Sequence, residues 1–219
     1  MTSAHTLTPA PEDAALTPAD LGVGARFTVA VMDADFARII LDALASADAT
    51  DLAVQSDPVS TLVRGSEQRV LEYVTAVIAA AARSGHHISA TLLLSRGCPG
   101  EVTCTTTPGL LAQAGPAPTI PATGIRASAH WSLYPLDDSG RPGEAPDHLR
   151  DIYAAIDYAK QRKTYVRSEH YATLLEGDIA DVLTTVAAGW MLVGRSVQHV
   201  TSHVTISIAS PTSAVTTED

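Results

Sequence analysis

An internal repeat constrains this chain more than any other feature of its sequence. Residues 56–99 align without a gap on residues 168–211, a shift of 112 positions. Thirteen of these 44 positions are identical, which indicates a duplicated unit and predicts two similar halves. The identical pairs are Ser56/Ser168, Thr61/Thr173, Leu62/Leu174, Gly65/Gly177, Val70/Val182, Leu71/Leu183, Val74/Val186, Ala76/Ala188, Arg83/Arg195, Ser84/Ser196, His87/His199, Ser95/Ser207 and Pro99/Pro211.

The hydrophobic pattern of the first half predicts the order β-α-β-β-α-β. Alternating and β-branched apolar residues indicate strands, while apolar residues at helical spacing follow Phe36. Ser66 is placed to cap the second helix. The predicted segments are strands 26–32, 52–55, 59–63 and 87–95, a helix from residue 36 and a helix from 66 to about 84.

The second half repeats this order, with extra residues around 139–143 that are expected to form a surface loop. Its predicted segments are strands 129–134, 164–167, 170–175 and 200–208 and helices 149–159 and 178–195. The order is the ferredoxin-like plan, an α+β fold whose antiparallel sheet carries both helices on one face. The bare sheet face must be covered, so we expect sheet-to-sheet contact within the chain or across a homodimer.

These segments divide the chain into five parts. The Ala-, Thr- and Pro-rich start has no sustained periodicity and is expected to be a disordered tail. The Pro/Gly/Thr-rich middle is expected to be a linker. The predicted parts are a tail (1–24), a first ferredoxin-like unit (25–99), a linker (100–124), a second ferredoxin-like unit (125–211) and an acidic tail (212–219).

The charge balance narrows the class of partner. The formal net charge is −10, which argues against nucleic acid and anionic membrane surfaces and mildly favours a cationic ligand. There is no signal-peptide pattern, and no apolar stretch approaches the roughly 18 residues that a membrane span needs. We therefore expect a soluble, cytoplasmic protein.

Several chemically suggestive residues have a simpler interpretation. Cys98 and Cys104 lack a matching Cys/His pair and are expected to be free thiols. His199 and His203 share a strand face and leave a metal-dependent enzyme as one hypothesis, although solvated or hydrogen-bonded histidines are the more common case. Ser66 lacks the Gly-x-Ser-x-Gly pattern of a nucleophile elbow, so no catalytic residue and no metal are predicted.

The hairpin of each unit offers a candidate binding pocket beside its first strand. Thr61 and Thr173 occupy equivalent places and, with backbone groups, Tyr134 and Tyr171, could hold a flat heterocycle between sheet and helix. Three acidic side chains could offset a positive charge: Glu169, Glu176 and Asp178. A threonine retained only for sheet geometry explains the same pattern equally well.

Four segments, taken together and in order, resemble the YkoF family of thiamine- and hydroxymethylpyrimidine-binding proteins. The resemblance runs from about Ala25 to Pro211. The segments are Leu133-Tyr134-Pro135-Leu136, Ser60-Thr61-Leu62-Val63-Arg64-Gly65-Ser66, Gly97-Cys98-Pro99-Gly100, and His170-Tyr171-Ala172-Thr173 through Glu176-Gly177-Asp178.

The resemblance implies tandem ferredoxin-like (ACT-like) units, a homodimer and one ligand site per unit. It implies binding of thiamine or its pyrimidine precursor in salvage or uptake, with no catalytic step, no cofactor and a precursor transporter as a further candidate partner. The implied contacts are the hydroxyls of Thr61 and Thr173 and the backbone groups of Val29 and Leu133; Tyr134 and Glu176 complete the predicted set.

The sequence departs from the family pattern in the first unit. Ala30 stands where the second unit has Tyr134, so the second site is expected to bind more tightly, or alone. An ACT-like regulatory module that senses another small metabolite is the alternative function.

Overall fold

The computed structural model describes residues 22–97, 116–136, 148–195, 197 and 199–212. The predicted order β-α-β-β-α-β occurs twice and is confirmed. The elements are β1 (Gly24–Val31), α1 (Phe36–Ser46), β2 (Ala53–Ser56), β3 (Thr61–Arg64), α2 (Glu67–Ala82), β4 (Ile88–Arg96), β5 (Arg126–Leu136), α3 (His148–Gln161), β6 (Tyr165–Glu169), β7 (Ala172–Asp178), α4 (Ile179–Val193) and β8 (His199–Ile208).

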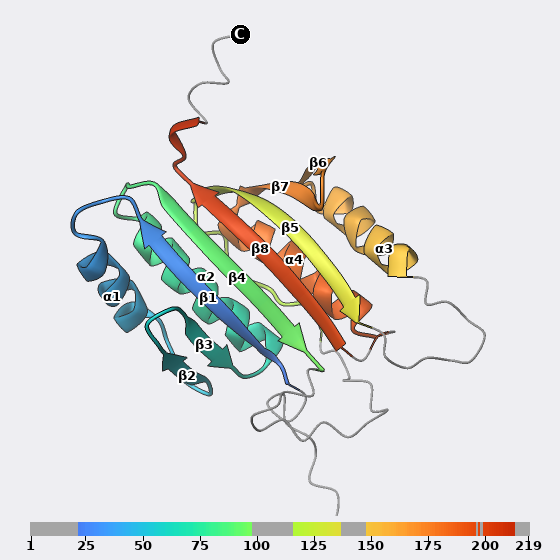
Figure 1. Cartoon of the computed structure of the whole chain (residues 1–219), viewed down its shortest axis with the longest axis horizontal. Helices are drawn as coiled ribbons and strands as arrows, with labels where there is room; N and C mark the ends of the chain where they lie inside the picture. Colours follow the sequence, from blue (N-terminus) through green and yellow to red (C-terminus); the bar gives the residue numbers. More distant parts are fainter. Residues whose placement is uncertain (1–21, 98–115, 137–147, 196, 198, 213–219) are drawn as a thin grey trace, which may run out of the picture.

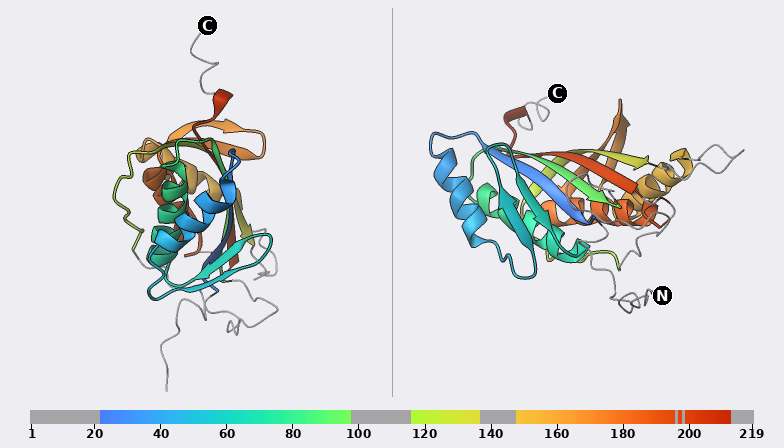
Figure 2. Two further views of the ribbon diagram at one scale, coloured as in Figure 1. Left: turned by 90° about the vertical axis from the view of Figure 1, so that its left-hand side faces the viewer. Right: turned by 60° about the horizontal axis from the view of Figure 1, so that its bottom comes forward.

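The strands form one antiparallel sheet in the order β2-β3-β1-β4-β8-β5-β7-β6, and the helices cover one of its faces (Figures 1 and 2). The halves join edge to edge where β4 pairs with β8. Leu92 pairs with Val204, its own equivalent in the repeat, so a pseudo-twofold axis passes between these two buried residues.

The core lies between the sheet and the helices, where each strand directs alternate side chains. Helix α4 is buried on nearly every side because it packs against the sheet, α2 and α3. Its apolar sequence, Ile179 to Val193, therefore suits a central helix.

Three sequence expectations need correction. The strand expected at 59–63 begins at Thr61, because the Asp57 carboxylate accepts the backbone N–H groups of Val59 and Ser60 and holds them in a turn. The strand expected at 170–175 begins at Ala172, after Tyr171 with φ 65°. The contact between units is made along strand edges, so in the described chain it leaves the open sheet face uncovered.

Part of the predicted linker is held firmly in place. The backbone N–H groups of Thr123 and Gly124 donate to the Asp178 carboxylate, and Thr123 Oγ1 does so as well, at 2.9 Å. Asp178 also caps α4 by accepting from Ala180 N. The described residues do not include either cysteine, loop 139–143 or most of the predicted tails.

These bonds lower the pKa of Asp178 despite its partial burial. Burial alone would raise the pKa of this carboxyl, but the donors from Ala180, Thr123 and Gly124 favour the charged form and outweigh it. A carboxyl with a depressed folded pKa stabilises the fold above its unfolded pKa of about 3.9. That contribution is lost as pH falls through the folded value.

Asp178→Ala is expected to cost about 2–3 kcal/mol of unfolding free energy at pH 7, because it removes a helix cap and leaves linker donors without an acceptor. Ser66→Ala is the matched control, since Ser66 caps α2 through Arg69 N alone and should cost about 1 kcal/mol. Urea unfolding from pH 7 to 3 measures both. The Asp178 penalty should shrink below about pH 4, and an equal, pH-independent loss in both variants would contradict this account.

Candidate functional site

A cavity of about 250 Å³ opens in the first unit between the sheet, α1 and the β2–β3 turn; we call it the hairpin pocket. Its apolar walls come from Phe27 and Val29 on β1, Ile40 and Leu44 on α1, and Val77 on α2. Ile40 and Leu44 are four residues apart and therefore lie on one face of α1. The volume suits a small ring, since sites for drug-sized ligands begin near about 300 Å³.

The backbone of β1 is open at this pocket. The ladder between β1 and β3 ends at the pair Phe27–Thr61, so Val29 lies beyond it. Met32 N donates to His87 O, which places the peptide groups of even-numbered β1 residues on the β4 side. The N–H and C=O of Val29 consequently face the β3 side, beyond the end of the ladder.

Two hydroxyls meet at the end of the hairpin. Ser56 Oγ and Thr61 Oγ1 lie 2.9 Å apart and share a hydrogen bond, and both residues line the pocket. Thr61 is only 6% exposed. A hydroxyl has one donor and two acceptor positions, so this pair retains capacity to bind a polar group in the pocket.

The turn adds a carboxylate at the rim. Asp57 accepts from Val59 N and Ser60 N, and its Oδ2 forms an ion pair with Arg26 Nη1 at 2.9 Å. The two backbone donors, and then Arg26, lower the pKa of Asp57. The carboxylate is therefore ionised at neutral pH and stays close to the cavity.

The equivalent place in the second unit is filled differently. Leu133 and Thr173 are both buried on the helix face of the sheet. Trp131 pairs with Thr173 as Phe27 pairs with Thr61, but its ring packs against α4. A Cβ at Gly189 would lie 2.6 Å from Trp131 Cη2, so the indole fills the space that Val77 and Phe27 border in the first unit.

The remaining predicted residues lie outside the space between the sheet and the helices. Tyr134 is 49% exposed on the open sheet face, opposite to Leu133, so it does not complete a pocket between sheet and helix. Glu176 lies on the open face beside Ser128 and forms an ion pair with Arg126. Tyr171 is 95% exposed, and Glu169 pairs with Arg167.

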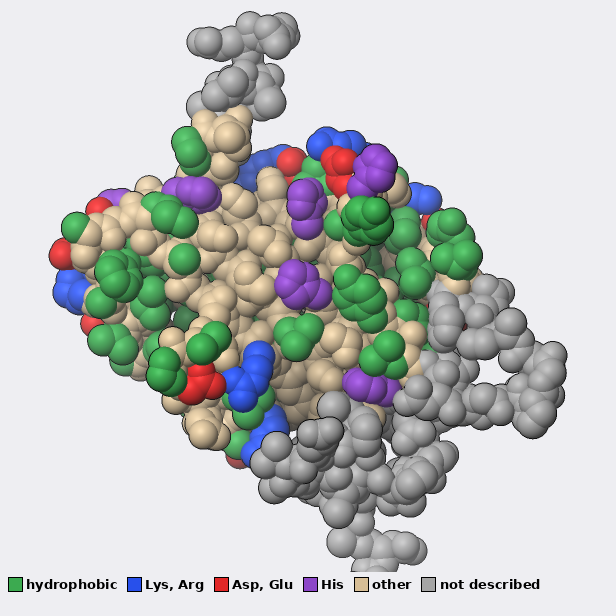
Figure 3. Space-filling model, in the orientation of Figure 1, with side chains coloured by type: hydrophobic (Ala, Val, Ile, Leu, Met, Phe, Trp, Pro, Cys, Tyr) green, Lys and Arg blue, Asp and Glu red, His purple; other side chains and the backbone are tan. Residues whose placement is uncertain are grey.

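The open face is polar but carries little charge over its central strands (Figure 3). His199 and His203 lie there on β8, four residues apart. The described residues contain no group of three His, Cys, Asp or Glu side chains arranged to hold a metal ion. Ser66 caps α2 by accepting from Arg69 N, as expected.

Sequence reasoning missed several residues of the hairpin pocket. Ser56 is identical to Ser168 in the repeat, so the alignment could have identified it together with Thr61. Asp57 carried a turn signal, and Ile40 with Leu44 carried a helical one. None of these signals predicts that Ile40 and Leu44 of α1 lie opposite the β2–β3 turn, because their position depends on packing between segments that are distant in the sequence.

Comparison with known proteins agrees with this duplicated architecture. The YKOF-related family model matches residues 22–101 and 126–213, one match for each unit. The Bacillus subtilis (strain 168) protein named "Putative HMP/thiamine-binding protein YkoF" is 32% identical over 191 residues, which cover 86% of this chain and 90% of that protein. Among the described helices, none is long and apolar enough to cross a membrane. Two matched regions and a relative aligned over most of both chains establish that this protein belongs to the YKOF-related family.

Proposed function

We propose that the protein binds thiamine or its hydroxymethylpyrimidine precursor, without converting it, in the cytoplasmic salvage or uptake of thiamine. The hairpin pocket is the proposed site. One observation carries the proposal: the free peptide edge of Val29 and the Ser56–Thr61 hydroxyl pair border one small, mostly apolar cavity. The name of the Bacillus relative supports the ligand class.

The chemistry of the ligand matches this edge. An aminopyrimidine presents an exocyclic amine donor beside a ring-nitrogen acceptor. A strand residue beyond the end of its ladder presents C=O and N–H on the same side, which complements that pair. Phe27, Ile40 and Val77 would contact the ring faces, and Thr61 would bind a second polar atom.

The cationic thiazolium ring of thiamine would lie toward the rim. The net charge of −10 favours approach of a cation, and the Asp57 carboxylate, which is ion-paired with Arg26, lies at this rim. Binding therefore needs no charged group deep in the pocket. We infer that the ligand is bound without a catalytic step, because the pocket wall offers hydrogen bonds and apolar contacts. The Bacillus relative is likewise named as a binding protein.

A ligand panel tests the proposal and its alternative. Thiamine or hydroxymethylpyrimidine at about 100 times its Kd should raise the thermal midpoint by roughly 5–10 °C, because a ligand that binds only the native state stabilises it. Differential scanning fluorimetry measures the thermal midpoint with each of these ligands and, for comparison, with thiamine phosphates and common amino acids. A shift with an amino acid and with no thiamine-related compound would instead support the regulatory alternative.

Matched threonine variants test the site. Thr61→Val keeps the side-chain shape and removes the hydroxyl, so it should weaken binding about tenfold. Thr173→Val should change affinity by less than about twofold, since Trp131 packs beside Thr173. Isothermal titration calorimetry decides between them.

This expectation reverses the one drawn from sequence, which rested on Tyr134. Val29→Pro offers a second variant that removes the N–H facing the pocket. The donors of the β1·β4 ladder belong to even-numbered residues, so the sheet should tolerate it. Loss of binding with Thr173→Val alone would place the site in the second unit instead.

We also propose that the protein is a homodimer that buries the open sheet face. Serine, threonine and histidine dominate this face on β4 and β8, with Leu93 at its centre and 39% exposed. A face with so few charges can pack against a second copy without burying ions. A transporter for thiamine precursors is a further candidate partner.

The dimer is tested by sedimentation equilibrium. The wild-type protein should sediment at twice the chain mass, and Leu93→Glu should sediment as a folded monomer because it buries an unpaired carboxylate at the interface. Leu149→Glu on α3 is the control, since Leu149 is exposed on the helix side. A wild-type monomer would disprove the proposal.

A further inference from the structure

We propose that a second cavity, between α2 and the segment Thr119–Gly124, binds a small molecule that joins an apolar body to a carboxylate or phosphate group. We call this segment the strap. The cavity measures about 520 Å³, within the range of small-molecule sites. It is distinct from the hairpin pocket, since the two share no lining residue.

The strap is pinned at both ends. Gln68 on α2 donates from Nε2 to Thr119 O at 2.8 Å and accepts from Thr119 N at 2.9 Å. Asp178 accepts from Thr123 and Gly124 at the other end. The strap runs along the helix side of the molecule (Figure 2). Its Ile120 and Pro121 form an apolar wall of the cavity.

A buried hydroxyl without a partner borders the cavity. Thr75 on α2 is 2% exposed, and its Oγ1 forms no hydrogen bond with any described residue. Leaving such a group unsatisfied is unfavourable. The fold does not require it, because Ala187 occupies the equivalent place in the second unit and is fully buried. The hydroxyl is thus a feature that a ligand's polar atom would satisfy.

One arginine at the rim, Arg83, points to an anionic ligand. Arg69 is already engaged by Asp48 and Glu72, so these three charges are committed to one another. Arg83 also lines the cavity, is exposed, and forms no ion pair with any described residue. It is the cation available to a ligand.

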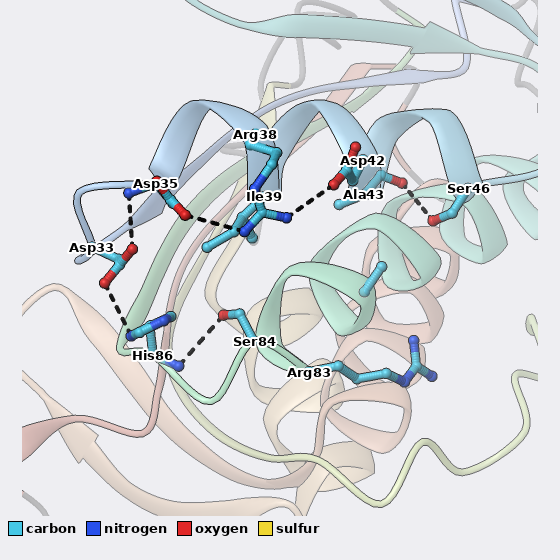
Figure 4. Close-up of a pocket in the computed structure, with 11 residues that line it drawn as sticks. Asp33, Asp35, Arg38, Ile39, Asp42, Ala43, Ser46, Arg83, Ser84 and His86 are labelled. Carbon is cyan, nitrogen blue, oxygen red and sulfur yellow. Dashed lines mark hydrogen bonds and ion pairs between the residues drawn. The ribbon is translucent and has the colours of Figure 1, made fainter.

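Arg83 also lines the neighbouring groove between α1 and the end of α2, but it forms no ion pair with the described carboxylates of that groove. There Arg38 forms ion pairs with Asp35 and Asp42. His86 Nδ1 lies 3.6 Å from a carboxylate oxygen of Asp33. Figure 4 shows Arg83 extending away from these residues. The small side chains of α2 on the cavity side leave room for the ligand's apolar body.

Aromatic probes with matched shapes test the cavity. Phenylacetate and phenyl phosphate supply the two anions, and phenylacetamide supplies the neutral control. At about 10 mM, one or both anions should displace backbone amide signals of α2 and the strap in NMR spectra of the whole protein, and the amide should bind at least about tenfold more weakly. No displacement of these signals by either anion would overturn the proposal.

Variants assign any binding to the cavity. Arg83→Gln should weaken the anion about tenfold, and Thr75→Ala by several fold. Thr75→Ala mimics Ala187 and should fold, while Thr75→Ser should keep the wild-type affinity. Arg38→Gln is the charge control, and equal losses in Arg38→Gln and Arg83→Gln would reveal general attraction and overturn the site.

Thiamine titrations separate this proposal from the proposed function. Arg83→Gln should bind thiamine as the wild-type protein does, and Thr61→Val should bind the anionic probe normally. Anion binding without thiamine binding would leave the strap cavity standing and disprove the function proposed for the hairpin pocket. Thiamine binding without anion binding would disprove the proposal for the strap cavity and leave the function proposed for the hairpin pocket intact.

Discussion

The pairing of β4 with β8 is the interaction on which the architecture depends. Nine residues of each strand pair in register about the Leu92–Val204 contact, and every alternate side chain faces the core. A four-stranded unit alone would leave its β4 edge free, which is a site for unwanted association. Joining the two units at this edge satisfies both backbones and makes one continuous core beneath α2 and α4.

This central pairing also determines where a ligand can reach the backbone. β1 pairs along its whole length with β4, but its pairs with β3 end at Phe27. The shortness of the hairpin, not a missing residue, leaves Val29 open. Because Asp57 ties the turn and Ser56 bonds to Thr61, the end of β3 is fixed and the opening keeps its shape.

Local sequence signals predicted the order of the elements and the Ser66 cap of α2, because that cap acts through a neighbour in the chain. The repeat then predicted that Thr61 and Thr173 are equivalent, and the paired strands agree. The sequence could also have predicted the sheet face on which Tyr134 lies. Tyr134 follows Leu133 directly in a strand, so its side chain must point to the opposite face. The strap could not be predicted, because Gln68 and Asp178 bind it across about fifty residues of sequence.

The two units show how one core can be filled in two ways. In the first unit Phe27 meets Tyr73 edge to face, and Val77 stands behind the pocket. In the second, Trp131 lies against Gly189, while Thr185 replaces Tyr73 and bonds to Thr164. A larger strand residue is thus matched by smaller helix residues, as close packing requires. The cavity follows from this exchange, so differences in binding between the units need no difference in backbone fold.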